Sequence, residues 1–492
     1  MKRLRFTSIT LARIFLMFLS AAGYPAQEEL VLPEGLEPKA ASPEEPALPP
    51  GLGSSPPSQR EDIQPPALPP GLGEENPAPA APGQEPFQAL NLPFELSGFL
   101  DGRIGTRIHG DPYEETLCLE ETRLQVQAEK NWIHLGMKLT ADFLYDGIVD
   151  QTGIHLETGA GYVDLRDANV SVTPASFMDI KAGRQILTWG VGDLIFINDL
   201  FPKDYVSFFI GRDVEYLKAP SDAFKISFFG QQVNVNLVYT PRFDPDRFIT
   251  GSRLSYYSPT LGRTAGRDAI IRTETPDRWF KDDEIALRLY RNLRGYELAL
   301  YGYRGFWKSP AGTDPKTGRA VFPELGVYGA SARGKFLKGI ASIEIGHYDS
   351  AENRAGDNPF IKNSEFRLLL GYEQELARNF TAGMQYYIEH IINYGEYLES
   401  LPWGTPQRDE NRQVLTLRLS QLLMSQNLSL SLFTFYSPSD RDGYVRPNAH
   451  YKINDHWSTE LGGNVFFGDR ASSFFGQFEI DSNVYSSLRI SF

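Results

Sequence analysis

The sequence predicts an all-β fold, a transmembrane antiparallel β-barrel of about 18 strands, with 16 as the alternative if one weak hairpin is misassigned. Three observations support this. Apolar and polar residues alternate over runs of about ten or more from residue 94 onward, short and long connections follow each other, and the chain ends on an amphipathic strand that stops at Phe492. Strands of soluble sheets are commonly about 5 to 6 residues long, whereas a tilted bilayer crossing needs about 9 to 11.

The alternation gives each strand one apolar and one polar face. Residues 232–240 and 457–467 follow this pattern, and in the final strand Leu488 and Ile490 oppose Arg489. Because successive side chains of a strand point to opposite faces, the whole sheet acquires an apolar side and a polar side. A barrel of this size is too wide to be filled by its own side chains. We therefore expect lipid outside and a water-filled interior, unless a loop folds into it.

The connections between strands alternate in length. Short turns are expected at residues 130–131, 174–176, 230–231, 293–295, 338–339, 376–379, 423–426 and 454–455. Longer segments include residues 147–161, 188–211, 241–282, 307–324, 350–362, 393–410 and 468–481. Outer-membrane barrels have short periplasmic turns and long outer loops. Eight turns and nine outer connections, with both termini on the periplasmic side, give 18 strands.

The predicted barrel, residues 89–492, follows two segments of different composition. Residues 1–24 combine basic residues, a short apolar run and small residues, as in an export signal peptide. Residues 25–88 hold 17 of the 34 prolines, repeat PALPPGLG, and carry 11 acidic against 2 basic residues. We expect this proline-rich arm to be disordered. It is either a passive spacer or the binding segment for a periplasmic or cell-wall partner.

Several function classes find no support in the sequence. The net charge is −14, which argues against nucleic acid as a partner. Cys118 is the single cysteine, so no intrachain disulfide can form. No catalytic motif and no set of residues at metal-ligand spacing is present, so we expect no enzyme activity, no cofactor and no metal. A hydrolase with Ser and His on neighbouring strands is the remaining enzymatic alternative.

Residues 188–211 form the third predicted outer loop and carry the candidate pore site. The expected anchors of this loop on the barrel wall are Trp189, Phe196, Phe201 and Phe209. The expected charges of the pore constriction are Asp193, Asp199, Lys203, Asp204, Arg184, Arg212 and Asp213. We expect the four charges of the loop itself to face water, where opposed charges would orient polar solutes. The alternative is that they only hold the loop together by salt bridges.

Residues 183–209, with their Gly-Arg-Gln, Trp-Gly and Asp-Leu-Phe-Pro-Lys-Asp-Tyr elements, resemble a porin-like or alginate-export-like family of proteobacterial outer-membrane barrels. The last strand is similar to the closing strand of Gram-negative barrels, whose terminal Phe, here Phe492, is an assembly signal. The resemblance implies location in the cell outer membrane with the arm in the periplasm. It also implies contact with lipid, lipopolysaccharide and the outer-membrane assembly machinery, and a third loop that folds into the channel.

The function expected from these features is a porin-like channel, monomeric or trimeric, for passive passage or export of polar solutes. Its selectivity would be set by the inward-folded loop 188–211 and by the charged lumen. A structural or envelope-interaction barrel that works through the proline-rich arm is the alternative. An outer-membrane hydrolase is the third.

Overall fold

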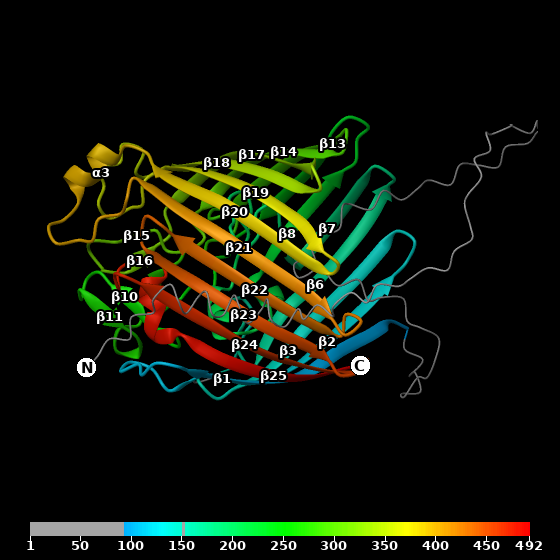
Figure 1. The fold of residues 1–492 in the computed structure, drawn as a ribbon. Helices are drawn as coiled ribbons and strands as arrows, with labels where there is room; N and C mark the ends of the chain where they lie inside the picture. The colour runs from blue at the N-terminus through cyan, green and yellow to red at the C-terminus, as the bar shows by residue number, and fades with distance from the viewer. Residues whose placement is uncertain (1–92, 150–152) are drawn as a thin grey trace, which may run out of the picture. The chain divides into compact units, whose positions relative to one another are not determined.

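The structure is a computed structural model that describes residues 93–149 and 153–492. The predicted signal peptide (1–24) and proline-rich arm (25–88) lie outside these residues. In the described part of the chain, 18 strands form one closed antiparallel sheet (Figure 1). The predicted all-β barrel is confirmed, and the strand count is 18 and not 16.

The strands of the barrel have the following bounds. The first nine are β1 (Glu95–Arg107), β2 (Leu117–Asn131), β3 (Leu135–Asp146), β6 (Val163–Ala175), β7 (Met178–Ile186), β8 (Pro220–Phe228), β9 (Asn234–Thr240), β13 (Glu284–Leu293) and β14 (Tyr296–Phe306). The other nine are β17 (Glu324–Phe336), β18 (Gly339–Ser350), β19 (Glu365–Ala377), β20 (Phe380–Ile391), β21 (Asn411–Leu423), β22 (Leu428–Ser437), β23 (Asp442–Lys452), β24 (Trp457–Gly468) and β25 (Asn483–Ser491). Each pairs with its neighbours along the chain.

The barrel closes where the last strand meets the first. β25 pairs antiparallel with β1, with Arg489 opposite Asp101. At the end of the seam, the Phe492 amide donates to the Gly98 carbonyl oxygen at 3.0 Å, and the Gly98 amide donates back at 3.0 Å. The terminal residue therefore belongs to the closing ladder. Its predicted role as an assembly signal stays a prediction.

The two faces of the wall differ as the alternation predicts. On β21, Leu415 is exposed, whereas its neighbour Thr416 is buried. The exposed apolar residues around the barrel include Leu100, Leu139, Phe143, Leu298, Leu300, Ile343, Leu370, Met384, Leu461 and Leu488. The buried charged residues of the same strands include Asp101, Arg103, Glu121, Arg123, Glu344, Glu365, Glu389, Arg446 and Glu460. An apolar outer belt around a charged interior is the arrangement of a membrane barrel.

The connections follow the predicted lengths. Within the described residues, seven of the eight predicted short turns overlap a break between paired strands, and longer connections join the other ends. The turn predicted at residues 130–131 is shifted, because these residues still pair within β2 and the chain turns at residues 132–134. The third long connection covers residues 187–219 and contains α2 (Tyr205–Ile210) and the 3-10 helix η1 (Val214–Leu217). It extends beyond the predicted end at 211 because η1 follows before β8 begins. We call residues 187–219 the inner loop.

The remaining elements lie in the long connections, which Figure 1 shows gathered at one end of the barrel. They are β4 (Ile154–His155), β5 (Ala160–Gly161), β10 (Tyr256–Ser258), β11 (Arg263–Ala265), β12 (Thr273–Glu274), β15 (Gly312–Thr313), β16 (Ala320–Val321), α3 (Tyr394–Ser400), η2 (Arg267–Ala269) and η3 (Gly476–Asp481). Among the residues that the structure describes, no helix has the length and apolar character needed to span a membrane.

A hydrophobic core lies inside the barrel. Ile197, Phe208 and Phe209 of the inner loop are buried in one cluster with inward-facing aromatic residues of the strands, such as Tyr444 and Phe466. The rings of Tyr444 and Phe466 stack with centroids 4.6 Å apart. Part of the interior is therefore filled by packed side chains, because the inner loop folds into it.

Candidate functional site

The inner loop crosses the interior and contacts walls that are far apart around the barrel. At its beginning, the Asp193 carboxylate accepts from the Arg418 guanidinium of β21 at 2.6 Å. Near its end, the carbonyl oxygen of Gly211 accepts from Arg103 of β1 at 2.8 Å. The two strands are separated by several others in the sheet on either side. The loop thus bridges two distant parts of the barrel wall.

The predicted anchors are distributed along the loop. Phe201 and Phe209 are buried in the interior core, and Trp189 and Phe196 are partly buried against it. The ring of Trp189 meets that of Phe201 edge-on, with centroids 4.9 Å apart, and lies 6.2 Å from Tyr301 of β14. The Phe209 ring lies 5.0 Å from Phe466 of β24. These rings place the two halves of the loop on different parts of the wall.

Asp199 and Lys203 form a buried pair within the loop. The Lys203 ammonium donates to Asp199 at 3.0 Å and to the Phe201 carbonyl oxygen at 2.7 Å, and Lys203 is only 2% exposed. Asp204 is also buried, and its carboxylate caps α2 by accepting from the Ser207 amide at 2.7 Å. The expectation that these three side chains face water is therefore wrong. They hold the loop together, as the alternative interpretation states.

The fourth long connection, residues 241–283 between β9 and β13, bonds to the inner loop and contributes to this burial. The Arg247 amide donates to the Lys203 carbonyl oxygen at 2.8 Å, and the Tyr205 amide donates to the Arg247 carbonyl oxygen at 3.1 Å. Asp246 accepts from the Lys203 amide at 2.7 Å. Residues 203–205 are thus pinned to a segment about forty positions away in the sequence.

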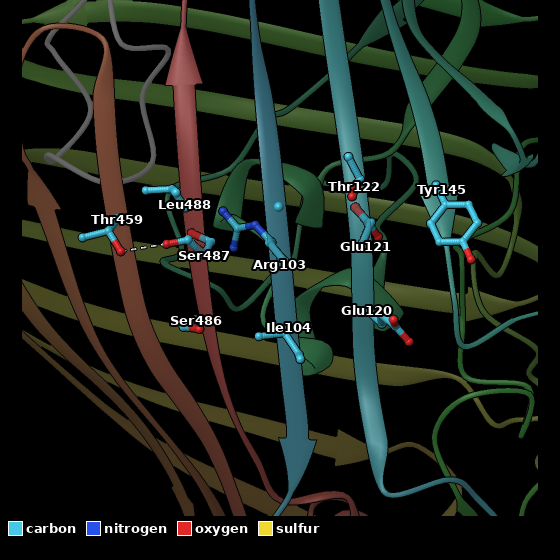
Figure 2. Close-up of a pocket in the computed structure, with 11 residues that line it drawn as sticks. Arg103, Ile104, Glu120, Glu121, Thr122, Tyr145, Thr459, Ser486, Ser487 and Leu488 are labelled. Atoms are coloured by element: carbon cyan, nitrogen blue, oxygen red, sulfur yellow. Dashed lines mark hydrogen bonds between the residues drawn. The ribbon is translucent and has the colours of Figure 1, made fainter.

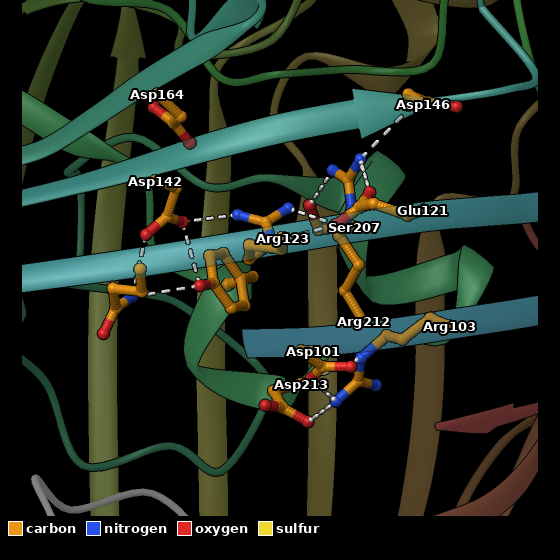
Figure 3. A network of polar contacts seen from close by, with 12 residues as sticks. Asp101, Arg103, Glu121, Arg123, Asp142, Asp146, Asp164, Ser207, Arg212 and Asp213 are labelled. Atoms are coloured by element: carbon orange, nitrogen blue, oxygen red, sulfur yellow. Dashed lines mark hydrogen bonds and ion pairs between the residues drawn. The ribbon is translucent and has the colours of Figure 1, made fainter. Parts of the chain in front are cut away.

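Arg212 and Asp213 join the end of the inner loop to the opposite wall, as Figure 3 shows. The Arg212 guanidinium donates to Glu121 of β2 at 2.8 Å. The Asp213 carboxylate accepts from Arg103 at 2.5 Å and also pairs with Arg489 of β25. Burial alone would raise the pKa of Asp213, but the two guanidinium groups outweigh it and hold this pKa well below its usual range.

A neighbouring cluster was not predicted from the sequence. The Tyr216 hydroxyl donates to Asp142 of β3 at 2.9 Å, and Asp142 also accepts from Arg123 of β2 at 2.5 Å (Figure 3). The Arg123 guanidinium lies 4.1 Å from the centre of the Tyr216 ring. The regular spacing of charges on the polar faces of the strands indicated that Arg123 faces the interior. The sequence did not indicate that Tyr216 contacts both Arg123 and Asp142.

Arg184 lies apart from the other predicted site residues. Its guanidinium donates to Asp222 of β8 at 2.9 and 2.7 Å, and also to the Leu156 carbonyl oxygen in the second long connection. Neither Asp222 nor Leu156 belongs to the inner loop. Arg184 therefore joins two strands to an outer loop at the rim.

The carboxylate of Asp193 in the inner loop has a perturbed pKa, which is a common feature of functional sites. Burial raises its pKa to about 6, even though the neighbouring Arg418 lowers it. Glu373 acts in the same direction as burial, and Arg333 opposes it. Both residues lie on the wall near Asp193, on β19 and β17. This carboxylate can thus change its charge near neutral pH.

A separate hollow of about 580 Å³ lies across β24, β25 and β1 to β3 (Figure 2). Ile104, Tyr145 and Leu488 line it and are 53%, 63% and 49% exposed, whereas Arg103 on the same wall is 8% exposed. The hollow therefore opens on the apolar outer face of the barrel. It is not part of the interior crossed by the inner loop.

No known family model and no curated protein sequence matches the chain. Solved structures are similar in fold. Acinetobacter baumannii OccAB4 gives a TM-score of 0.50 at 9% identity, over 82% of this chain and 98% of that chain. Acinetobacter baumannii OccAB3 gives 0.47 at 9% identity, over 81% and 99%, and Pseudomonas aeruginosa OccD3 gives 0.45 at 11% identity, over 81% and 91%. The likeness to OccAB4 agrees with the closed barrel, and the predicted resemblance is confirmed for the fold.

Proposed function

We propose that the protein is a porin-like channel of the cell outer membrane that passes polar solutes by diffusion, inward or outward, through a constriction formed by the inner loop. The observation that carries this proposal is the inner loop itself, which lies inside a barrel with an apolar outer belt and is bonded to opposite walls. A loop in this position limits the size of what can pass, and the charges beside it select by charge.

The proposed selective charges differ from those expected at first. Asp193 and Arg418 are both partly exposed and form the ion pair, with Glu373 and Arg333 as electrostatic neighbours. Asp199, Lys203 and Asp204 support the loop from within. This arrangement places opposed charges at one edge of the constriction, where they would orient a polar solute.

Conductance in planar bilayers tests the proposal. The purified protein is expected to produce discrete current steps, and Arg418→Gln is expected to shift the reversal potential toward cation preference. Arg263→Gln is the matched comparison, because it removes an arginine that pairs with Asp268 in an exposed connection and has no role in holding the inner loop. A bilayer that stays silent after verified insertion of the protein would overturn the proposal.

The selectivity of the channel is expected to depend on pH through Asp193. Its pKa of about 6 means that the carboxylate is charged above this pH and neutral below it. Neutralisation leaves Arg418 and Arg333 less compensated, so cation preference should fall as the pH drops from about 8 to about 5. The measurement is the reversal potential under a salt gradient. In Asp193→Asn the change across this range should disappear, and an equal change in that variant would assign the effect to another group.

A structural or envelope-interaction role is the second candidate, and one observation favours it. The inner loop and the fourth connection together fill part of the interior with a hydrophobic core. A barrel that binds envelope partners through its proline-rich arm would need no passage. This role would be supported by a folded protein that shows no conductance but binds peptidoglycan. Deletion of residues 25–88 should then abolish the binding.

The proposed location carries three expected contacts. The apolar belt would meet lipid and, in the outer leaflet, lipopolysaccharide. The closing strand with Phe492 would be recognised by the outer-membrane assembly machinery. Deletion of Phe492 should therefore lower the amount of barrel inserted in cells more than it lowers folding of the purified protein.

A further inference from the structure

Residues 190–198, which we call the loop tip, wrap around the carboxylate of Glu344. The amides of Val191 and Gly192 donate to its Oε2 at 2.9 and 3.1 Å. The amide and the side-chain Nδ2 of Asn198 donate to its Oε1 at 2.8 and 2.9 Å. Glu344 lies on the inward face of β18 and is 1% exposed. Among the described residues, no lysine or arginine lies within ion-pair distance of it, and the donors that bond to its carboxylate belong to the loop tip.

The sequence of the loop tip suits this wrap. Gly190 has a φ of +84°, which favours glycine, and a Cβ there would lie 2.8 Å from Oε1 of Glu344. A Cβ on Gly192 would lie 2.1 Å from the Ile195 carbonyl oxygen. The two glycines therefore allow successive amides to converge on one carboxylate, as in a backbone anion-binding nest.

The rest of the inner loop is held in a different way. Its later part is fixed by the backbone bonds of residues 203–205 to Arg247 and by the ion pairs of Arg212 and Asp213. The loop tip has fewer polar contacts with the wall. Besides Glu344, they are the Asp193 pair with Arg418, the Asp193 amide to Gln385, and the bonds of Ile197 and Asn198 to Tyr348 and Ile345.

We propose that Glu344 is the positioning residue that holds the loop tip across the interior and thereby sets the width of the passage. The inference about the width of the passage rests on the proposed channel function, whereas the inference about the position of the loop tip does not. Removal of the carboxylate leaves four donors without their acceptor, two of them on buried Asn198 and two on partly buried Val191 and Gly192. This favours a displaced loop tip where these donors can meet water. Hydrogen bonds to a charged acceptor contribute enough that the displaced state should become roughly ten-fold or more populated.

The test uses Glu344→Ala and the isosteric Glu344→Gln in the full-length protein. Hydrogen exchange followed by mass spectrometry reports on position, and exchange should accelerate in residues 190–198 but not in residues 203–217. Planar-bilayer recordings report on width, and the variants should show a larger conductance state. Liposomes should also admit larger uncharged polyethylene glycols. Glu344→Asp, which retains the carboxylate, should lie between the wild type and Glu344→Gln.

The matched control is Glu297→Gln. Glu297 is an inward glutamate on β14 that pairs with Arg288 of β13 at 2.7 Å and not with the loop tip. Circular dichroism verifies that each variant folds as a barrel. If Glu344→Ala does not fold, the comparison is made with Glu344→Gln.

The two readouts separate the inference from the proposed function. Faster exchange in the loop tip without any conductance in wild type or variants would support Glu344 as the positioning residue and overturn the channel. Unchanged exchange in the loop tip would overturn the role of Glu344, whatever the conductance. Faster exchange with conductance and size limit both unchanged would overturn its control of width.

Discussion

Arg103→Met is expected to lower the free energy of unfolding by roughly 3–5 kcal/mol, because it breaks a buried network and leaves carboxylates unpaired. The Arg103 guanidinium pairs with Asp101, Asp213 and Glu460 at 3.0, 2.5 and 3.1 Å. Methionine retains most of the apolar stem but supplies no charge. Unfolding in urea, followed by tryptophan fluorescence in detergent or lipid, measures the loss.

The pH dependence of this loss identifies its cause. Without Arg103, the Asp213 carboxylate loses one of its two cations, and its pKa in the folded variant rises toward or above the unfolded value. The folded variant then binds protons more readily, so the difference from wild type should shrink as the pH falls. Arg263→Met is the control because Arg263 pairs with Asp268 on the exposed surface. A loss of similar size in the control would contradict the role of burial.

Leu300→Arg is expected to cost about 2–4 kcal/mol of stability in lipid, because a charged side chain on the outer belt must sit in hydrocarbon. Leu300 is 59% exposed near the middle of β14. Its register partners on the neighbouring strands are Leu289 and Ala330, which are also apolar. Folding titrations in phospholipid vesicles measure the change.

Thr381→Arg is the matched control for the belt. Thr381 is partly exposed on β20, and its register partners are Glu375 and Ser420. An arginine there would meet water and a nearby carboxylate, so the stability should change little while the ion selectivity shifts. Equal losses for Leu300→Arg and Thr381→Arg would contradict the assignment of the two faces.

The wall of the barrel could be predicted from the sequence because the residue pattern that defines each strand lies within the strand itself. Residues 415–420 read Leu-Thr-Leu-Arg-Leu-Ser, and the period of two alone assigns each side chain to a face. The eight turns follow from short polar or glycine-containing breaks between such runs. The closing role of β25 was expected from the amphipathic end of the chain and its similarity to the closing strand of Gram-negative barrels.

The interior could be predicted only in part, because its contacts join distant segments. The third long connection lies where the sequence predicts it, and Arg212 and Asp213 contact the wall, while their place at a pore constriction stays a prediction. The burial of Lys203 depends on Asp246 and Arg247, which belong to another loop. Glu344 stands between Ile343 and Ile345 like any inward glutamate. Only the convergence of the loop amides on it, which requires the folded structure, reveals its distinct position.

The orientation of the two faces is tested most directly by single cysteines in lipid vesicles, with Cys118 replaced by serine. The positions are Leu417→Cys and Leu419→Cys on the apolar face and Ser420→Cys and Thr381→Cys on the polar face. Each carries an environment-sensitive fluorophore, which is quenched either by a nitroxide lipid or by iodide in water. The structure predicts lipid quenching at the two leucine positions and iodide quenching at the other two. Iodide quenching at all four positions, or a protein that stays soluble without detergent, would contradict a barrel with lipid outside and water within.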